Sequence, residues 1–201
     1  MKLYLTPGAC SLADHIALHE AGFDFDRVKV DLKAKTTEDG RDYTRINPKG
    51  YVPALELDDG QILTENIAIL SWVADNDPSL GLPGPMGRHR LLEMLAFIST
   101  EIHKAFKPFF NPQATSQDKQ AAMQTLHKRF DTVAGQIKGD YLFGQQFTVA
   151  DAYLFVMLTW AKKNVIPLPE PLNDYFQRVK ARPAVKLALE HEAAEPAHAA
   201  S

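Results

Sequence analysis

The single cysteine of this 201-residue chain, Cys10, stands where a sulfur atom could carry negative charge. It follows Pro7-Gly8-Ala9 and precedes Ser11, a residue type that commonly begins helices. The first turn of a helix offers unpaired backbone N–H groups and the positive end of the helix dipole, and both favour an anion. We therefore interpret Cys10 as a functional thiol rather than an inert buried residue. It could be a thiolate itself, or a thiol that donates to another negative sulfur.

Two histidines close to Cys10, His15 and His19, are candidate metal ligands. Their i, i+4 spacing places both imidazoles on one face of a helix. No third ligand at a defined spacing accompanies them, so a solvated helix face is the preferred interpretation and no metal is expected. A single cysteine also excludes an internal disulfide, a cysteine-rich zinc site and a Cys-x-x-Cys redox pair.

Composition narrows the classes of partner. The formal net charge of -3 is too small to attract nucleic acid or an anionic membrane. The sequence has no run of about 18 uncharged apolar residues that could span a membrane. Only a few apolar residues precede Pro7, too few for the core of a signal peptide. We expect a soluble, cytoplasmic protein whose partners are small molecules or protein.

The first 78 residues have the pattern of a small α/β domain that would position Cys10. Predicted strands cover 2–6 and 27–32, and the helix between them begins at Ser11 and ends near Gly22. The next segments are expected to be a polar loop at 33–40, a short helical piece at 42–46, an antiparallel hairpin within 54–63 and a helix over 64–75. The order β-α-β-α-β-β-α predicts a thioredoxin-like domain.

The rest of the chain is predicted to be helical. Prolines and glycines concentrated in 79–87 indicate a linker. Apolar residues at every third or fourth position then predict helices over 88–109, 117–137, from 148 onward, 172–181 and 184–192, with a frayed tail from Ala193. Thr148 and Asp151 are expected to form a capping box. The predicted domains are therefore 1–78 and an all-helical 88–201.

The long predicted helix at 88–109 carries two groups of interest. One of its faces holds four residues at i, i+4, i+7 and i+11 that could look across a cleft: Ala96, Thr100, His103 and Lys107. Three aromatic residues are interpreted mainly as core, although part of the group could line a pocket for an apolar co-substrate: Phe106, Phe109 and Phe110.

Five segments carry a resemblance to a known family: KLYLTPGACSLADHIAL, NPKGYVPAL, LTENIAIL, EIHKAF and FTVADAYLF. Over essentially the whole chain the sequence resembles the glutathione transferases, and the cysteine in the first segment resembles the bacterial beta class. The resemblance implies a thioredoxin-like domain followed by an all-helical domain, and a homodimer. It also implies glutathione as co-substrate, without a metal, and conjugation of the glutathione thiolate to hydrophobic electrophiles, as in detoxification of xenobiotics.

The resemblance also implies a site. Cys10 and His103 would be catalytic, with the imidazole near the glutathione sulfur, where it could hydrogen-bond the thiol or tune its ionisation. A cis Val52–Pro53 bond would turn the Val52 backbone toward the cysteinyl unit, whereas a trans proline that ends a loop is the alternative. The implied glutathione contacts are Cys10, Lys35, Val52, Pro53, Glu65, Asn66, Thr100, Glu101, His103 and Lys104. The implied contacts to the hydrophobic co-substrate are Phe106, Phe109 and Phe110.

Within that site, the charged ends of glutathione have separate partners. The start of the helix at Glu65 and Asn66 would receive the γ-glutamyl end, its carboxylate on backbone N–H groups and its ammonium on a carboxylate. The alternative is ordinary helix capping by Thr64, with Glu65 as an acid of the first turn. Lys35 would meet the glycyl carboxylate as a mobile point charge, or would simply be solvated.

One residue departs from the family pattern, and two other functions stay open. Beta-class proteins commonly have an asparagine where Ala96 stands, which reaches the glutathione of the neighbouring subunit, and alanine cannot make that hydrogen bond. The first alternative function is Cys10-dependent thiol–disulfide exchange, of the kind a one-cysteine glutaredoxin performs. The second is a non-catalytic module that binds glutathione, another ligand or a protein.

Overall fold

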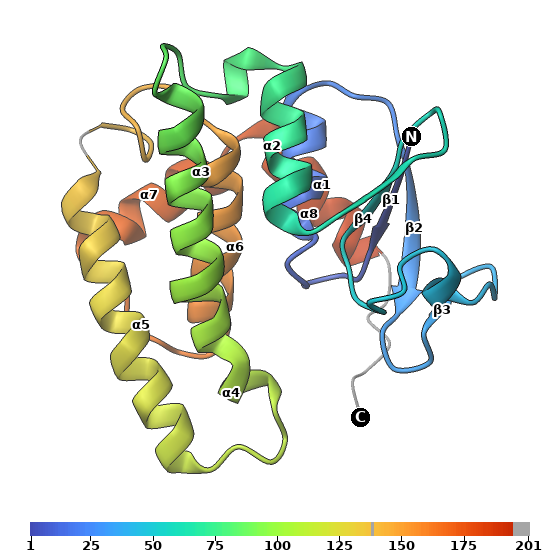
Figure 1. Ribbon diagram of the computed structural model, residues 1–201. Coiled ribbons are helices and arrows are strands. Elements are labelled where there is room, and N and C mark those ends of the chain that lie inside the picture. The colour runs from blue at the N-terminus through green and yellow to red at the C-terminus, as the bar shows by residue number, and fades with distance from the viewer. Residues whose placement is uncertain (138, 195–201) are drawn as a thin grey trace. The chain divides into compact units, whose positions relative to one another are not determined.

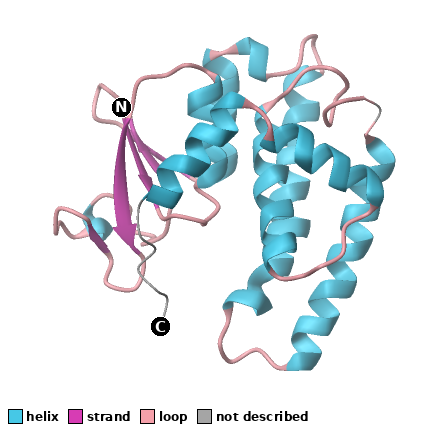
Figure 2. Cartoon of the chain, turned by 180° about the vertical axis from the view of Figure 1, so that it is seen from behind, coloured by secondary structure: helices cyan, strands magenta, loops and turns pink. Residues whose placement is uncertain are grey.

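The computed structural model describes residues 1–137 and 139–194, which form two compact units. The first contains Met1–Asp77 together with Arg182 and helix α8 (Pro183–Ala194), and the second contains Pro78–Ala181. All the strands belong to the first unit, and the second is built from helices and loops in the residues described (Figure 2). The predicted fold class, a thioredoxin-like domain followed by a helical domain, is confirmed.

The first unit has a mixed five-stranded sheet in the order β3-β2-β1-β4-β5. Its strands are β1 (Lys2–Leu5), β2 (Asp26–Asp31), β3 (Thr36–Thr37), β4 (Ala54–Glu56) and β5 (Ile62–Thr64). β1 is parallel to β2, with Leu3 opposite Arg27, and antiparallel to β4, with Leu3 opposite Leu55. The predicted β-α-β unit and the β4–β5 hairpin are thereby confirmed.

Three helices accompany this sheet: α1 (Leu12–Glu20), α2 (Asn66–Asn76) and α8. Leu3, Leu5 and Ile16 are among its fully buried side chains, so apolar burial links β1 to α1. Helices α1 and α8 pack together (Figure 1). The Arg182 guanidinium, just before α8, donates two hydrogen bonds to the Glu20 carboxylate, at 2.6 and 2.7 Å. The predicted second domain, 88–201, includes this last helix, whereas in the structure the helix belongs with the first unit.

One local prediction in the first unit needs correction. The predicted loop at 33–40 contains the short strand β3, because Thr36 and Thr37 pair antiparallel with Asp31 and Val30. The short helical piece predicted at 42–46 is confirmed as the 3-10 helix η1 (Tyr43–Arg45), which the Asp42 side chain caps by accepting the Thr44 N–H.

The second unit begins with η2 (Pro78–Leu80) and then has a helical run where one long helix is predicted. This run consists of α3 (Gly87–Phe97), the π-helical η3 (Ile98–His103), the 3-10 segment η4 (Lys104–Phe106) and α4 (Lys107–Phe110). A π-turn holds an extra residue, which rotates everything after it by about 100° around the axis. The prediction that Ala96, Thr100, His103 and Lys107 share one face assumes uninterrupted α-helical spacing. Because the π-helical segment interrupts that spacing, the spacing no longer supports a common face.

The other helices of this unit are α5 (Ser116–Gln136), α6 (Val149–Lys163) and α7 (Glu170–Lys180). Helix α6 is buried along nearly its whole length, and it begins at the predicted capping box, which is confirmed. The buried Asp151 carboxylate accepts the Thr148 N–H at 2.8 Å and the Thr148 hydroxyl at 2.7 Å, together with the Leu142 N–H and the Tyr175 hydroxyl, both at 2.8 Å. Burial raises the pKa of Asp151, and these hydrogen bonds oppose that rise.

The end of the described chain differs from the predicted limits. Helix α8 continues to Ala194, so the predicted helix 184–192 is longer, and the rest of the predicted frayed tail lies outside the described residues. No helix among residues 1–137 and 139–194 is both long enough and apolar enough to cross a membrane.

Candidate functional site

Cys10 lies in the loop between β1 and α1, residues 6–11, which we call the Cys10 loop. The Cys10 side chain is half-buried, and its Sγ–H donates to the Val52 carbonyl at 3.6 Å. The Asn66 side-chain amide, at the start of α2, donates to the Cys10 carbonyl at 2.9 Å. Three segments that are distant in sequence therefore meet at this cysteine.

Ser11 does not cap α1 in the predicted way. Its backbone is already helical, with φ -57° and ψ -18°, and its side chain makes no cap hydrogen bond. Instead the hydroxyl turns back into the Cys10 loop, where it accepts the Thr6 N–H at 3.3 Å and donates to the Thr6 carbonyl at 3.4 Å. Ser11 therefore shapes the loop on the N-terminal side of Cys10.

The ionisation of Cys10 is decided by burial. Burial raises the pKa of the Cys10 thiol to about 12, and the nearby Asp14 carboxyl acts in the same direction. Hydrogen bonds from the backbone N–H groups of Cys10 and Ser11 favour the thiolate but do not overcome this. Of the two interpretations made from the sequence, the structure favours the thiol that donates, because the helix start is too weak to ionise the sulfur.

The Val52–Pro53 peptide bond is cis, as the family resemblance predicts. Two donors hold the residue before Val52: the Tyr51 carbonyl accepts the Asn47 side-chain amide at 2.7 Å and the Tyr43 hydroxyl at 3.1 Å. This segment is thereby anchored to the body of the first unit, and Val52 is buried within its core cluster.

Lys35 lies against the same segment. Its side chain is exposed, and the ammonium donates to the Gly50 carbonyl at 2.7 Å. Lys35 itself has φ 58°, the left-handed region that single turn residues adopt. The lysine is therefore not a freely solvated side chain, but is held beside Val52 through Gly50.

Glu65 precedes α2 with a strained backbone, at φ 77° and ψ 126°, and makes no cap hydrogen bond. Such a conformation costs on the order of 1–3 kcal/mol and persists where neighbouring contacts hold it. Here the carboxylate forms an ion pair with Lys49 and accepts the Tyr51 hydroxyl at 2.7 Å. These hydrogen bonds, that of Lys49 first, lower the pKa of Glu65. The alternative, ordinary capping by Thr64, is not what the structure shows, because the N-cap position of α2 is Glu65.

Lys49 and Tyr51 are residues of this cluster that we did not predict. Both lie in the segment NPKGYVPAL, but nothing in that pattern shows which side chain they face. Tyr51 is 43% exposed, which is unusual for a large aromatic residue and places it at the surface beside Glu65. The one signal in the sequence is the position of Tyr51 directly before the Val52–Pro53 pair.

The remaining predicted residues are in the second unit. His103, at the end of the π-helical η3, has Nδ1 2.6 Å from the Tyr153 hydroxyl, and its ring packs edge-on against Trp160 with centroids 5.0 Å apart. Burial, with a smaller effect of Lys104, lowers the pKa of His103 to about 4, so the imidazole is neutral near pH 7. Tyr153 is a partner that sequence reasoning did not identify. The role of His103 toward glutathione remains a prediction.

The other polar residues of this predicted group have local partners. The exposed Thr100 hydroxyl donates to the Ala96 carbonyl at 2.9 Å, within its own helical run. The Glu101 carboxylate pairs with Arg129 at 2.6 Å. Lys104 is exposed. None of these contacts links the three residues to one another.

The aromatic group divides between core and surface. Phe106 is fully buried, so it cannot contact a co-substrate in this conformation, and its predicted pocket role is corrected to packing in the core. Phe109 is half-buried, whereas Phe110 is 55% exposed and lies edge-on to Trp160 with centroids 4.8 Å apart. Only Phe109 and Phe110 are exposed enough to contact a molecule at the surface.

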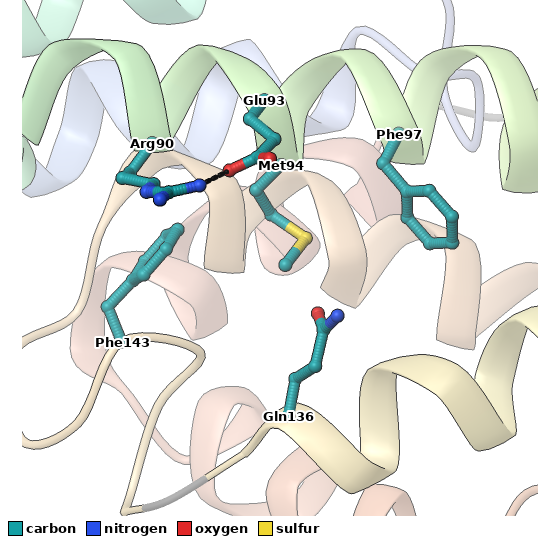
Figure 3. Close-up of a pocket in the computed structure, with 6 residues that line it drawn as sticks. All are labelled: Arg90, Glu93, Met94, Phe97, Gln136 and Phe143. Carbon is teal, nitrogen blue, oxygen red and sulfur yellow. Dashed lines mark hydrogen bonds and ion pairs between the residues drawn. The ribbon is translucent and has the colours of Figure 1, made fainter. Parts of the chain in front are cut away.

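The second unit also has a cavity of about 360 Å³ that sequence reasoning did not predict (Figure 3). It is lined by Arg90, Glu93, Met94, Phe97, Gln136 and Phe143. Arg90 and Glu93 form an ion pair at 2.8 Å on one side of it. The predicted contacts to a hydrophobic co-substrate, including Phe110, are not part of this lining.

Comparison with known proteins shows the family to which this chain belongs. Residues 9–76 match the family model for the glutathione S-transferase N-terminal domain, and residues 97–183 match the model for the C-terminal domain. The chain belongs to the glutathione S-transferase family.

Particular relatives refine this assignment. The chain is 45% identical to glutathione S-transferase GstA of Escherichia coli O157:H7 over 199 residues, covering 96% of this chain and 98% of that protein. A bacterial beta-class glutathione S-transferase of Sphingomonas chungbukensis superposes with a TM-score of 0.87 at 42% identity, covering 96% of this chain and 98% of that one. A sphingomonad glutathione S-transferase complexed with glutathione gives a TM-score of 0.88 at 43% identity, covering 97% and 100%. The resemblance to the beta class is confirmed.

Proposed function

We propose that this protein is a glutathione transferase that holds glutathione on its first unit and transfers the glutathione sulfur to an electrophilic carbon of an apolar compound. One observation carries the proposal: the network that joins Cys10 to Val52 and Asn66, next to the cluster of Glu65, Lys49 and Tyr51. The complex of a 43% identical relative with glutathione supports the choice of ligand.

The two charged ends of glutathione match charged groups of this network. The Glu65 carboxylate, whose lowered pKa keeps it ionised near neutral pH, is suited to the γ-glutamyl ammonium. The first N–H groups of α2 are suited to the adjacent carboxylate. Lys35, held beside Gly50, is suited to the glycyl carboxylate. The cysteinyl unit between these ends would then lie along Val52 and Pro53, which brings its sulfur to Cys10.

The chemistry follows from the state of the Cys10 thiol. A protonated Cys10 can turn its S–H from the Val52 carbonyl to the sulfur of bound glutathione. A hydrogen bond to a charged acceptor stabilises by about 1.5–3 kcal/mol, which lowers the pKa of the glutathione thiol and releases its proton to solvent. The thiolate then attacks the electrophilic carbon, a carbon–sulfur bond forms, and the leaving group departs with its bonding electron pair.

Thiol–disulfide exchange at Cys10 is the less favoured alternative. Exchange requires an attacking thiolate, and burial raises the pKa of the Cys10 thiol, which disfavours that thiolate. A non-catalytic module would bind glutathione without conjugating it. A combined test of binding and conjugation, described below, therefore separates that alternative from the enzyme.

Three finer features belong to the proposal. We propose a homodimer, as the family resemblance implies. We propose a cytoplasmic location, because a chain whose one cysteine is a functional thiol suits a reducing compartment. The electrophiles are proposed to be hydrophobic xenobiotics, and Phe109 and Phe110 are the proposed contacts for them.

The test combines binding and turnover. The full chain is passed over immobilised glutathione and assayed for conjugation of a chlorinated dinitrobenzene. We expect retention, elution by free glutathione, and conjugation above the rate without protein. Retention without conjugation would favour the binding module, and the lack of both would overturn the proposal.

A further inference from the structure

Three histidines of the first unit meet between α1 and α8. His15 and His19 lie on one face of α1, and His191 lies on α8, which packs against it (Figure 1). Each residue offers one ring nitrogen, and these nitrogens lie within 4.8 Å of one another. The sequence shows only the i, i+4 pair, because the third imidazole comes from the last described helix. The reason for expecting no metal, the lack of a third ligand, therefore does not hold.

We propose that His15, His19 and His191 bind one divalent transition-metal ion of the zinc type. A tetrahedral zinc ion with Zn–N bonds of about 2.0–2.1 Å holds its ligand nitrogens about 3.3–3.4 Å apart. The three nitrogens therefore need to approach by at most about 1.5 Å, which small side-chain rotations provide. Imidazole ligands suit zinc, nickel and copper, whereas magnesium and calcium prefer oxygen. Three protein ligands leave the fourth position to water or another ligand.

The polar atoms of this cluster also indicate a missing partner. His19 Nε2 and His191 Nδ1 are shielded from solvent and have no hydrogen-bond partner among the described residues. A buried nitrogen without a partner is unfavourable, and a metal ion would satisfy both atoms at once. The rings of these two histidines have centroids 5.3 Å apart, and Phe25 packs against His19 at 4.9 Å. Both histidines remain partly exposed as whole residues, so an ion can reach them.

Glu192 supplies the outer contact that metal-binding histidines usually have. Its Oε1 lies 3.3 Å from His15 Nδ1, and its Oε2 accepts the Gly8 N–H at 2.7 Å. A carboxylate on Nδ1 fixes the orientation of the ring and directs Nε2 to the metal, and the loss of such a partner commonly weakens metal affinity by about 10–100-fold. Because Gly8 belongs to the Cys10 loop, the proposed site is joined to that loop through one carboxylate.

The test uses the full chain without a histidine tag, freed of metal and studied without glutathione. Titration with Co²⁺ and then Zn²⁺ is expected to show about one equivalent bound and the visible absorption of tetrahedral cobalt. His19→Gln and His191→Gln should each weaken binding by at least about ten-fold, and Glu192→Gln by about ten-fold. Two controls, His89→Gln at an exposed histidine and Cys10→Ala, should leave the affinity unchanged.

X-ray absorption at the zinc edge of the wild-type protein gives a measurement that needs no variant. Three imidazole ligands are expected. The proposal is overturned if the wild-type protein binds no ion more tightly than about millimolar, if zinc shows a sulfur ligand or fewer than three imidazoles, or if folded His19→Gln and His191→Gln proteins bind as the wild type does. Because glutathione is absent, each of these results is independent of the proposed transferase activity.

Discussion

The two capping boxes of the second unit allow the effect of burial to be measured on one motif. Asp151 in the first turn of α6 and Asp118 in the first turn of α5 each accept the N–H and the hydroxyl of the threonine three residues earlier, at 2.7–2.9 Å. Asp118 is exposed, whereas Asp151 is fully buried and accepts two further hydrogen bonds, from Leu142 and Tyr175. The same substitution at the two positions should therefore have very different costs.

We predict that Asp151→Asn lowers the free energy of unfolding by about 2–4 kcal/mol. The new amide must direct its NH₂ group toward one of the two pairs of donors that now face the carboxylate. The hydroxyl in that pair can rotate and accept, but the backbone N–H of Leu142 or Thr148 then stays buried without an acceptor. An orphaned donor of this kind costs about 1–3 kcal/mol, and the hydrogen bonds lost to a charged acceptor add about 1 kcal/mol. Asp118→Asn should cost much less, because Asp118 is exposed and water replaces the lost acceptor.

Urea unfolding, followed by circular dichroism and tryptophan fluorescence, is the assay. Trp160 lies in α6, so its fluorescence reports on the helix that Asp151 caps. With a slope of about 3 kcal/mol/M, Asp151→Asn should lower the urea midpoint by about 1 M without changing the slope, and Asp118→Asn should lower it by much less. Equal shifts for the two variants, or no shift for Asp151→Asn, would show that burial does not set the energy of this cap.

Three further predictions concern the first unit. Cys10→Ala should raise the pKa of the bound glutathione thiol by about 1–2 units, whereas Cys10→Ser, which keeps a hydrogen-bond donor, should raise it less. The absorbance of the thiolate, followed against pH, measures this pKa. An unchanged pKa in Cys10→Ala would contradict the donor role of Cys10. Burial raises the pKa of Asp14 well above its usual range, so the folded state prefers the neutral acid and loses stability as pH rises from about 4 toward the folded pKa. Because the amide side chain introduced by Asp14→Asn does not titrate, the free energy of unfolding of this variant should rise relative to that of the wild type by up to about 1.4 kcal/mol per pH unit in that window. Asp24→Asn, at an exposed position, should show no such rise. Parallel pH dependences of the unfolding free energy for Asp14→Asn and the wild type would refute this prediction. Lys49→Met removes the ion pair of Glu65 and should raise the KM for glutathione by about two- to five-fold with kcat unchanged, so that a fall in kcat alone would argue against a binding role.

The elements that could be predicted from the sequence are those whose signals are local. The hairpin predicted within 54–63 and the Thr148–Asp151 capping box each depend on a few adjacent residues, and both are confirmed. β3 and the π-helical η3 were missed, because a two-residue strand and an extra residue in a helical turn depend on packing against other segments. Ser11 has the right position for a cap, but its backbone conformation was not predictable from its residue type.

The residues of the candidate site were predicted more from residue types and family resemblance than from the spacing of residues along the chain. The positions of Val52 and Asn66 around Cys10 agree with the resemblance. The ionisation of Cys10 was less predictable, because burial by distant segments outweighs the local effect of the helix start. Lys49 and His191 show why some site residues could not be predicted. The partner of Lys49 is Glu65 and those of His191 are His15 and His19, and only the folded chain brings these residues together.

The packing of α8 on α1 has a consequence for the order in which the protein is completed during translation. Residues 1–77 leave the ribosome first, but the helix that finishes their unit is made roughly a hundred residues later, about 5–20 s at ordinary rates of synthesis. During that interval neither His15 nor the Gly8 N–H can contact the Glu192 carboxylate. The nascent thioredoxin-like half is therefore an incomplete folding unit, and a ribosome that stalls before residue 183 would present it to chaperones without its last helix.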